Sequence, residues 1–300
     1  MTTDTLTQNL TVSRRNLLFA GFCLILAAFA FEPLRRLVEL SIDLNNADLS
    51  YIGLIPFISA ALIYWERQSI FVHPRTSFVP AVMLFAVGAA LYLLGQTGAA
   101  RLHGNDDLSL MAAAVIAFLF GGVFLIYGQV VFKAALFPLL FLLLAIPLPA
   151  QLLHAAITFL QHASASLVSV LFALTGTPVY RNDVSFSLPA LTITIAEECS
   201  GLRSTLGIFI VTLLAGRLLL RSNWRRLALL LAVIPISVFK NAVRIVALTL
   251  LAIHVDMRFL TGGLHHDGGI VFMMIGLVLL YPLLALLIRS EKDIHRGVRI

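Results

Sequence analysis

A polar segment at residues 196–204, Ala-Glu-Glu-Cys-Ser-Gly-Leu-Arg-Ser, carries a thiol, two carboxylates and a guanidinium directly before a long apolar run. Cys199 would therefore lie near a helix N-terminus, where amide groups and the helix dipole stabilise a thiolate. Glu197 and Glu198 oppose this effect unless they pair with Arg203. Because the thiolate is a nucleophile, the segment predicts a reactive cysteine, and the alternative is a buried, inert one.

An arginine lies inside a later apolar segment. Arg244 is about nine residues from the outer end of its predicted span, or about 13 Å deep at the rise of an α-helix. A charge at that depth costs at least ~2.5 kcal/mol, so this side chain must face the bundle interior or a wet cavity. Asn241 precedes it by one turn on the same side of the helix. A structural ion pair with a glutamate is the alternative to a functional role.

Two histidines, His265 and His266, lie in a polar sequence just before the last apolar segment. A histidine can take a proton from a thiol and return it to a leaving amine, although a loop histidine can equally be solvated. A thiol, a guanidinium and an imidazole together are the groups that an acyl-transfer reaction needs. Cys199 would attack a peptide carbonyl to form a thioester, and Arg244 or Arg203 would stabilise the oxyanion.

The composition is that of a polytopic membrane protein. The 300 residues are 60% hydrophobic and 12% charged, and the mean hydropathy is +0.97; soluble domains average about 25% charged residues. The net charge of +6 resides mainly between and after apolar runs, which indicates membrane topology rather than nucleic-acid binding. The two cysteines cannot form a disulfide framework, and Cys23 is expected to be a packing residue.

We expect an all-α fold of about eight transmembrane helices, at residues 16–31, 51–65, 78–94, 108–127, 130–146, 202–220, 227–253 and 269–288. Residues 1–15 would be a cytoplasmic tail, disordered over 1–13, residues 16–288 the membrane domain, and residues 289–300 a basic cytoplasmic tail. Arg14-Arg15 superficially resemble a twin-arginine signal, but the many later spans favour an uncleaved first helix.

Segment 151–174 is long enough to cross the bilayer, but polar residues interrupt it, so it either lies at the interface or packs inside the bundle. Its two histidines, His154 and His162, are two helical turns apart, and we favour polar packing over metal binding.

Residues 184–188 and 191–195 alternate apolar and polar side chains around Pro189-Ala190. This pattern predicts a short β-hairpin, or two extended strands, outside the bilayer. The distribution of basic residues places both termini in the cytoplasm of an inner-membrane protein. Cys199, the hairpin and loop 254–268 would then share the extracytoplasmic side.

The motif Glu-Cys-Ser-Gly-Leu-Arg-Ser at 198–204, Asn241-Ala-Val-Arg244-Ile, and His265 followed by Gly269 together resemble the exosortase/archaeosortase family. Segments 51–56 and 137–149 are also similar to that family. The resemblance covers most of the chain from about residue 48 to 288.

This resemblance implies a thiol transpeptidase of the membrane. Its substrates would be exported proteins with a C-terminal sorting signal of the Pro-Glu-Pro (PEP-CTERM) type, a transmembrane helix and a basic tail; the acceptor is open. Cys199 would be the nucleophile, Arg244 the functional arginine and His265 the acid–base group. His266 remains an alternative because Gly268 precedes Gly269. Arg203 matches the arginine that follows the family's cysteine.

No metal or organic cofactor and no nucleic-acid partner is indicated. Glu197 and Glu198 would orient Arg203 or the substrate, or be solvated acids. Two other functions stay open. One is a non-enzymatic membrane component of exopolysaccharide export or assembly. The other is a transporter in which Arg244 and Lys240 bind an anion, although no pair of broken helices supports it.

Overall fold

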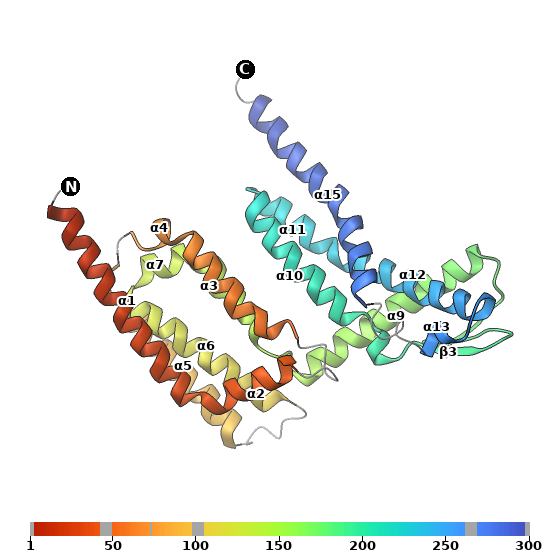
Figure 1. Cartoon of the computed structure of the whole chain (residues 1–300), viewed down its shortest axis with the longest axis horizontal. Helices are drawn as coiled ribbons and strands as arrows, with labels where there is room; N and C mark the ends of the chain where they lie inside the picture. Colours follow the sequence, from red (N-terminus) through yellow and green to blue (C-terminus); the bar gives the residue numbers. More distant parts are fainter. Residues whose placement is uncertain (1–2, 43–49, 73, 98–104, 262–268, 298–300) are drawn as a thin grey trace. The chain divides into compact units, whose positions relative to one another are not determined.

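The protein is helical with one small β-sheet, as a computed structural model shows for residues 3–42, 50–72, 74–97, 105–261 and 269–297 (Figure 1). Within these described residues, six helices are long and apolar enough to cross a membrane, or seven if one bent pair forms a single span. The all-α polytopic fold is therefore confirmed, with slightly fewer spans than the eight expected. The chain divides into two compact units, Met1–Leu153 and His154–Ile300.

The first unit is built around a helical hairpin in which small residues allow close packing. Gly88 of α5 faces the Phe118 ring of α6, and Gly121 of α6 faces Phe85, so that a Cβ at Gly88 would lie 2.9 Å from that ring. The elements of the unit are α1 (Thr3–Phe29), α2 (Phe31–Ile42), η2 (Ile52–Leu54), α3 (Ile55–Trp65), α4 (Arg67–Ile70), α5 (Phe78–Thr97), α6 (Asp106–Ile126), α7 (Gln129–Ala134), α8 (Leu136–Phe141) and η3 (Leu142–Ala145).

Several predictions for this unit were wrong. Helix α1 begins at Thr3, so the described part of the N-terminal tail is helical rather than disordered. The chain then bends by 80° into α2, a helix that, apart from Phe31, lies between the predicted spans 16–31 and 51–65 and belongs to neither of them as predicted; residues 43–49 lie outside the described part. The predicted span 130–146 is divided among α7, α8 and η3. Pro138 has no amide hydrogen to donate to Ala134, which accounts for the break between α7 and α8.

The second unit contains the sheet and the remaining long helices. Residues 150–174 form one continuous helix, α9 (Ala150–Leu174), which meets the length and hydropathy of a membrane span. The predicted hairpin is confirmed as β2 (Ser185–Ser187) and β3 (Thr192–Thr194), which pair antiparallel with Phe186 opposite Ile193. A strand that was not predicted, β1 (Tyr180–Asn182), pairs with β2 on the other side.

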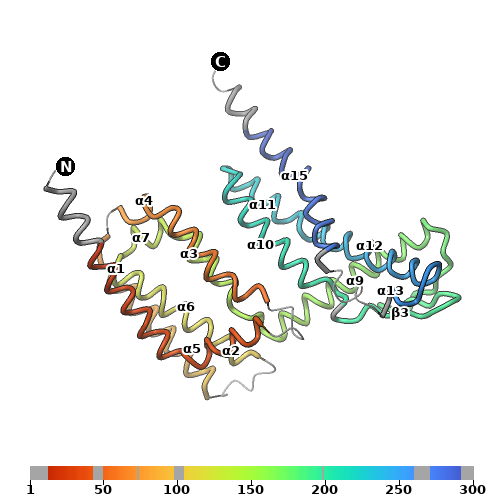
Figure 2. The backbone as a smooth tube through the Cα atoms, in the orientation of Figure 1, coloured from red at the N-terminus to blue at the C-terminus, as the bar shows by residue number. Residues whose placement is uncertain are grey.

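After the 3-10 turn η4 (Glu197–Cys199), the chain continues through α10 (Leu202–Leu219), α11 (Asn223–Leu231), α12 (Val233–His254), α13 (Arg258–Thr261) and α15 (Gly269–Gly297). Helices α10 and α12 run side by side, and α15 packs against both (Figure 2). Helix α15 extends to Gly297, so most of the basic tail expected at residues 289–300 belongs to this helix. The core beneath the sheet joins α9, the strands and α12 through buried side chains such as Phe172, Phe186 and Val246.

A buried carboxylate fixes the opposite end of α10 to the last helix. Glu291 of α15 accepts hydrogen bonds from the backbone amides of Arg221 and Ser222, at 3.1 and 2.7 Å. Arg225 Nη1 lies 3.3 Å from the same carboxylate. These amides precede α11 and have no partner within that helix, so Glu291 caps it from a distant part of the sequence.

Candidate active site

The candidate nucleophile lies in a tight turn between the sheet and α10. Cys199 ends η4, and Gly201 follows with φ of 79°, a left-handed conformation that glycine adopts without steric cost. Helix α10 begins at the next residue. The hydroxyl groups of Ser204 and Thr205 donate back to the carbonyl of Gly201 at 3.0 and 2.8 Å. The expectation that the thiol precedes a helix N-terminus is therefore confirmed.

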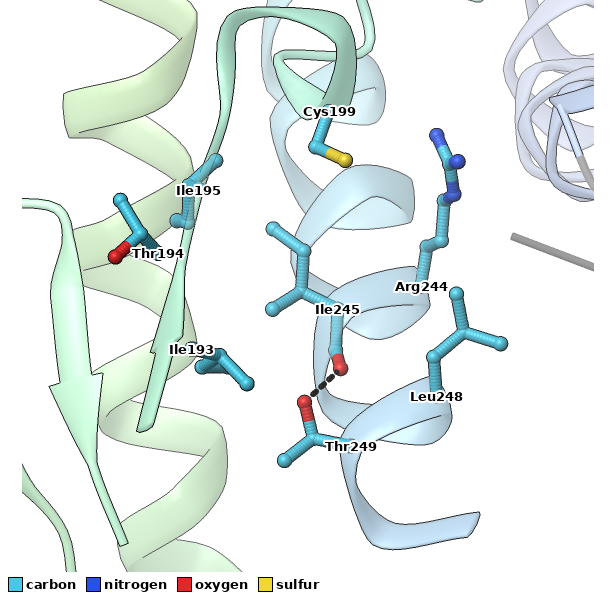
Figure 3. Close-up of a pocket in the computed structure, with 8 residues that line it drawn as sticks. All are labelled: Ile193, Thr194, Ile195, Cys199, Arg244, Ile245, Leu248 and Thr249. Atoms are coloured by element: carbon cyan, nitrogen blue, oxygen red, sulfur yellow. Dashed lines mark hydrogen bonds between the residues drawn. The ribbon is translucent and has the colours of Figure 1, made fainter. Parts of the chain in front are cut away.

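Cys199 and Arg244 line one small pocket between β3 and α12 (Figure 3). The thiol and the guanidinium lie toward the same end of it. Aliphatic side chains and two threonines form the remaining walls: Ile193, Thr194, Ile195, Ile245, Leu248 and Thr249. The pocket thus places a thiol and a guanidinium beside an apolar surface, an arrangement that could support attack on a carbonyl whose oxygen becomes negative.

Asn241 does not line the pocket, but its side chain contacts the backbone of the cysteine turn. Its side chain is 2% exposed. Its amide nitrogen lies 3.1 Å from the carbonyl oxygens of both Cys199 and Ser200, and also 3.1 Å from Ser164 Oγ of α9. One side chain of α12 therefore holds the cysteine turn, and it also ties that turn to α9.

The arginine contacts the beginning of the last helix. The guanidinium carbon of Arg244 lies 5.9 Å from the centroid of the Phe272 ring, a cation–π distance. Phe272 lies in the first turn of α15, which starts at Gly269. The N-terminal end of α15 is therefore beside the pocket, and sequence reasoning did not identify Phe272.

Lys240 forms a second polar contact that the sequence did not reveal. It is 1% exposed, and its ammonium group donates a hydrogen bond to the hydroxyl of Ser204 in the first turn of α10. Since Ser204 in turn donates to the Gly201 carbonyl, Lys240 is linked to the cysteine turn through this hydroxyl. The only signal in the sequence was the lysine itself, one residue before Asn241 in an apolar helix.

Helix α9 supplies the remaining support, which explains its polar interruptions. Gln161 donates to the carbonyl of Ile195 at 2.8 Å, at the point where β3 leads into the cysteine turn. Ser164, one turn later, meets Asn241. The two histidines do not share in this packing as predicted, because His154 and His162 are both exposed. Among the described residues there is no group of three or more side chains suited to a metal, and His162 instead lies 3.4 Å from Asp183.

Other predicted site residues are not brought to the pocket. Arg203 is exposed on the first turn of α10 and is absent from the pocket walls, and Glu197 is also exposed. Among the described residues, Arg244 is thus the guanidinium that the fold places beside the thiol. The Glu198 side chain, His265 and His266 lie outside the described residues.

Comparison with protein families gives a match over most of the chain. The family described as transmembrane exosortase matches residues 43–282, about four fifths of the chain. The chain belongs to the transmembrane exosortase family. The matched region includes Cys199, Arg244 and His265 and extends over the larger part of both structural units. No curated protein and no solved structure matches the chain.

Proposed function

We propose that this exosortase-family protein is a membrane cysteine transpeptidase that cleaves the C-terminal sorting signal of exported proteins and transfers them to an acceptor. The observation that carries the proposal is the shared pocket of Cys199 and Arg244, formed by segments about 45 residues apart in the sequence. A packing cysteine would have no need of a cation in the same pocket.

The reaction would proceed by acyl transfer. The Cys199 thiolate attacks the scissile carbonyl, and the new C–S bond forms as the carbonyl oxygen becomes an oxyanion beside Arg244. Collapse of this intermediate breaks the peptide C–N bond, and the leaving amine takes a proton. An amine or a water molecule then attacks the thioester, which gives a new amide or a carboxylic acid and returns the thiol.

A histidine would carry the proton between these steps. We assign this role to His265, with His266 as the alternative, since both precede α15 in the sequence and the first turn of α15 contacts Arg244 through Phe272. Glu198 and Arg203 would act on the substrate or on each other at the rim.

The substrate class follows from the family and from a site at the end of membrane helices. We propose exported proteins with a PEP-CTERM-type signal, whose transmembrane helix packs laterally against the bundle and whose basic tail stays in the cytoplasm. The site would face the extracytoplasmic side of the inner membrane, with both termini inside. The basic turn 221–226 contacts Ser290 and Glu291 near the end of α15, in agreement with a shared cytoplasmic side for that turn and the C-terminal end of α15.

The test is co-expression with a candidate substrate that carries such a signal, with the substrate followed by mass spectrometry. We expect a shortened substrate with the wild-type protein and with Cys23→Ala, a control that removes the cysteine of α1. Cys199→Ala should give the uncleaved substrate at equal protein level. The mass of the new C-terminus separates transfer to an amine from hydrolysis.

Equal processing by the wild type and Cys199→Ala would contradict the thiol mechanism. Intact substrate in every strain, across a panel of signal-bearing proteins from the same genome, would instead favour the non-enzymatic component of exopolysaccharide export.

A further inference from the structure

The strand that leads to the candidate nucleophile is an edge strand. The sheet formed by the described residues has the order β1-β2-β3, so β3 pairs with β2 on one side only. Three of the residues that line the Cys199 pocket, Ile193, Thr194 and Ile195, belong to β3 or directly follow it. A strand with one edge not paired to β2 therefore forms a wall of the Cys199 pocket.

The hydrogen-bond register shows which backbone groups of β3 point to that edge. The Ile195 amide donates to Val184 and the Leu188 amide donates to Leu191. Since bonded and non-bonded pairs alternate along an antiparallel ladder, Ile193 also directs its backbone groups to β2. The amide and carbonyl groups of Thr192 and Thr194 consequently point away from β2.

The side chains agree with this register. Thr194 and Ser185 face each other as a pair that does not exchange backbone bonds, and their hydroxyl oxygens are 2.9 Å apart. Close side-chain contact is typical of such pairs. The outward amide of Thr194 lies five residues before Cys199, at the wall of the same pocket.

We infer that the substrate segment around the scissile bond binds as an added β-strand along the outer edge of β3. This inference rests on the proposed function and specifies how the substrate is held. An extended peptide has alternating free amide and carbonyl groups, which match the outward groups of Thr192 and Thr194. A helical segment has its backbone groups paired internally and cannot make these bonds.

The proposal also explains how recognition and reaction are joined. A strand bound along β3 is directed toward the cysteine turn, because β3 itself continues into that turn. Alternate side chains of the bound strand point to the same face. Every second residue would therefore meet the aliphatic wall of Ile245 and Leu248, so apolar or small side chains are expected there.

The first test uses proline on the two edges of the sheet. Thr194→Pro removes the outward amide of β3, and proline is tolerated on edge strands. Arg181→Pro is the matched control, because the register directs the Arg181 amide to the outer edge of β1, away from the pocket. We expect Thr194→Pro to lower kcat/KM about tenfold or more, in keeping with the loss of a hydrogen bond to substrate, and Arg181→Pro to leave it near the wild-type value.

The second test leaves the enzyme unchanged and therefore does not depend on how a variant folds. Synthetic peptides that span the cleaved bond are N-methylated at one backbone position at a time and offered to the wild-type protein in detergent. We expect cleavage to be lost at alternate positions, because only every second amide of a bound strand faces β3.

The outcomes separate this inference from the proposed function. Cys199-dependent cleavage that is equally fast in Thr194→Pro, or that shows no alternation along the N-methyl series, would overturn strand addition while leaving the transpeptidase standing. Cleavage that persists at the wild-type rate in Cys199→Ala would overturn both the strand addition and the proposed function.

Discussion

Asn241 and Cys199 are joined by a hydrogen bond of 3.1 Å from the amide nitrogen of Asn241 to the carbonyl oxygen of Cys199. The helix that carries Arg244 therefore also holds the turn that carries the thiol. This bond therefore helps to set the position of the Cys199 thiol relative to the Arg244 guanidinium.

Asn241→Leu should impair both the turn and cleavage. The carbonyls of Cys199 and Ser200 would lose a buried donor, a change that costs about 1–3 kcal/mol. We expect a lower unfolding temperature in detergent and a cleavage rate reduced about tenfold or more. Ser237→Ala is the control on the same helix, since among the described residues its buried hydroxyl has no hydrogen-bond partner. Normal cleavage by Asn241→Leu would show that the turn holds its position without this side chain.

Gly201→Ala should be more harmful than a comparable glycine replacement. The residue has φ of 79°, and an added Cβ would lie 2.8 Å from Asn241 Oδ1. Gly176→Ala is the matched control, because Gly176 has φ of 67° but nothing within 4 Å of its Cβ position. Both variants should lose about 1–2 kcal/mol from the backbone conformation. Only Gly201→Ala should also lose cleavage per folded molecule, and equal activity of the two would contradict the proposed contact.

Arg244→Lys should lower kcat by about 10²–10³, the range seen when one oxyanion donor is removed. Lysine keeps the charge but lacks the planar fork and the contact of the guanidinium with Phe272. Steady-state kinetics on a cleavable peptide would separate kcat from KM. The same measurement on Arg203→Lys is the comparison, and a larger loss there would transfer the oxyanion role to Arg203 despite its position outside the pocket.

Glu291→Gln should destabilise the protein without altering the chemistry of the site. The uncharged glutamine side chain would accept the hydrogen bonds from the backbone N–H groups of Arg221 and Ser222 more weakly than the carboxylate does. The ion pair with Arg225 would be lost. We expect a loss of about 1–3 kcal/mol in the free energy of unfolding. Glu39→Gln is the control, because its ion pair with Arg35 is exposed to solvent and should contribute little to stability. Thermal unfolding in detergent would measure both, and equal stability of the two variants would argue against the buried cap.

Opposite sides of the membrane should be distinguished by cysteine labelling. In a background of Cys23→Ala and Cys199→Ala, single cysteines replace Tyr180 of β1 and Trp224 of α11, which are both about 70% exposed. A membrane-impermeant maleimide should label the cysteine at 180 in intact spheroplasts. The cysteine at 224 should react only after the membrane is broken. The reverse pattern would place the pocket on the cytoplasmic side.

Helices that correspond to long apolar runs were predicted well, whereas the positions at which the chain interrupts a helix were not. The apolar runs of α5, α6 and α10 were found to within a few residues, because the bilayer requires about 20 apolar residues to form a spanning helix. The breaks between α1 and α2 and within residues 130–146 depend on single residues and on packing. Strand β1, Tyr-Arg-Asn, is too short and too polar for its pairing with β2 to show in the sequence.

The sequence alone determined that this is a helical membrane protein and which residues have the chemistry for acyl transfer, because hydropathy and residue type are properties of each segment by itself. Only the tertiary structure decided which of them meet. Asn241 and Arg244 lie three residues apart on one helix, which separates their side chains by about 60° around its axis. One side chain therefore meets the backbone of the cysteine turn while the other meets the pocket. Such a division depends on the packing of α9, the sheet and α12, which segments far apart in the chain determine together.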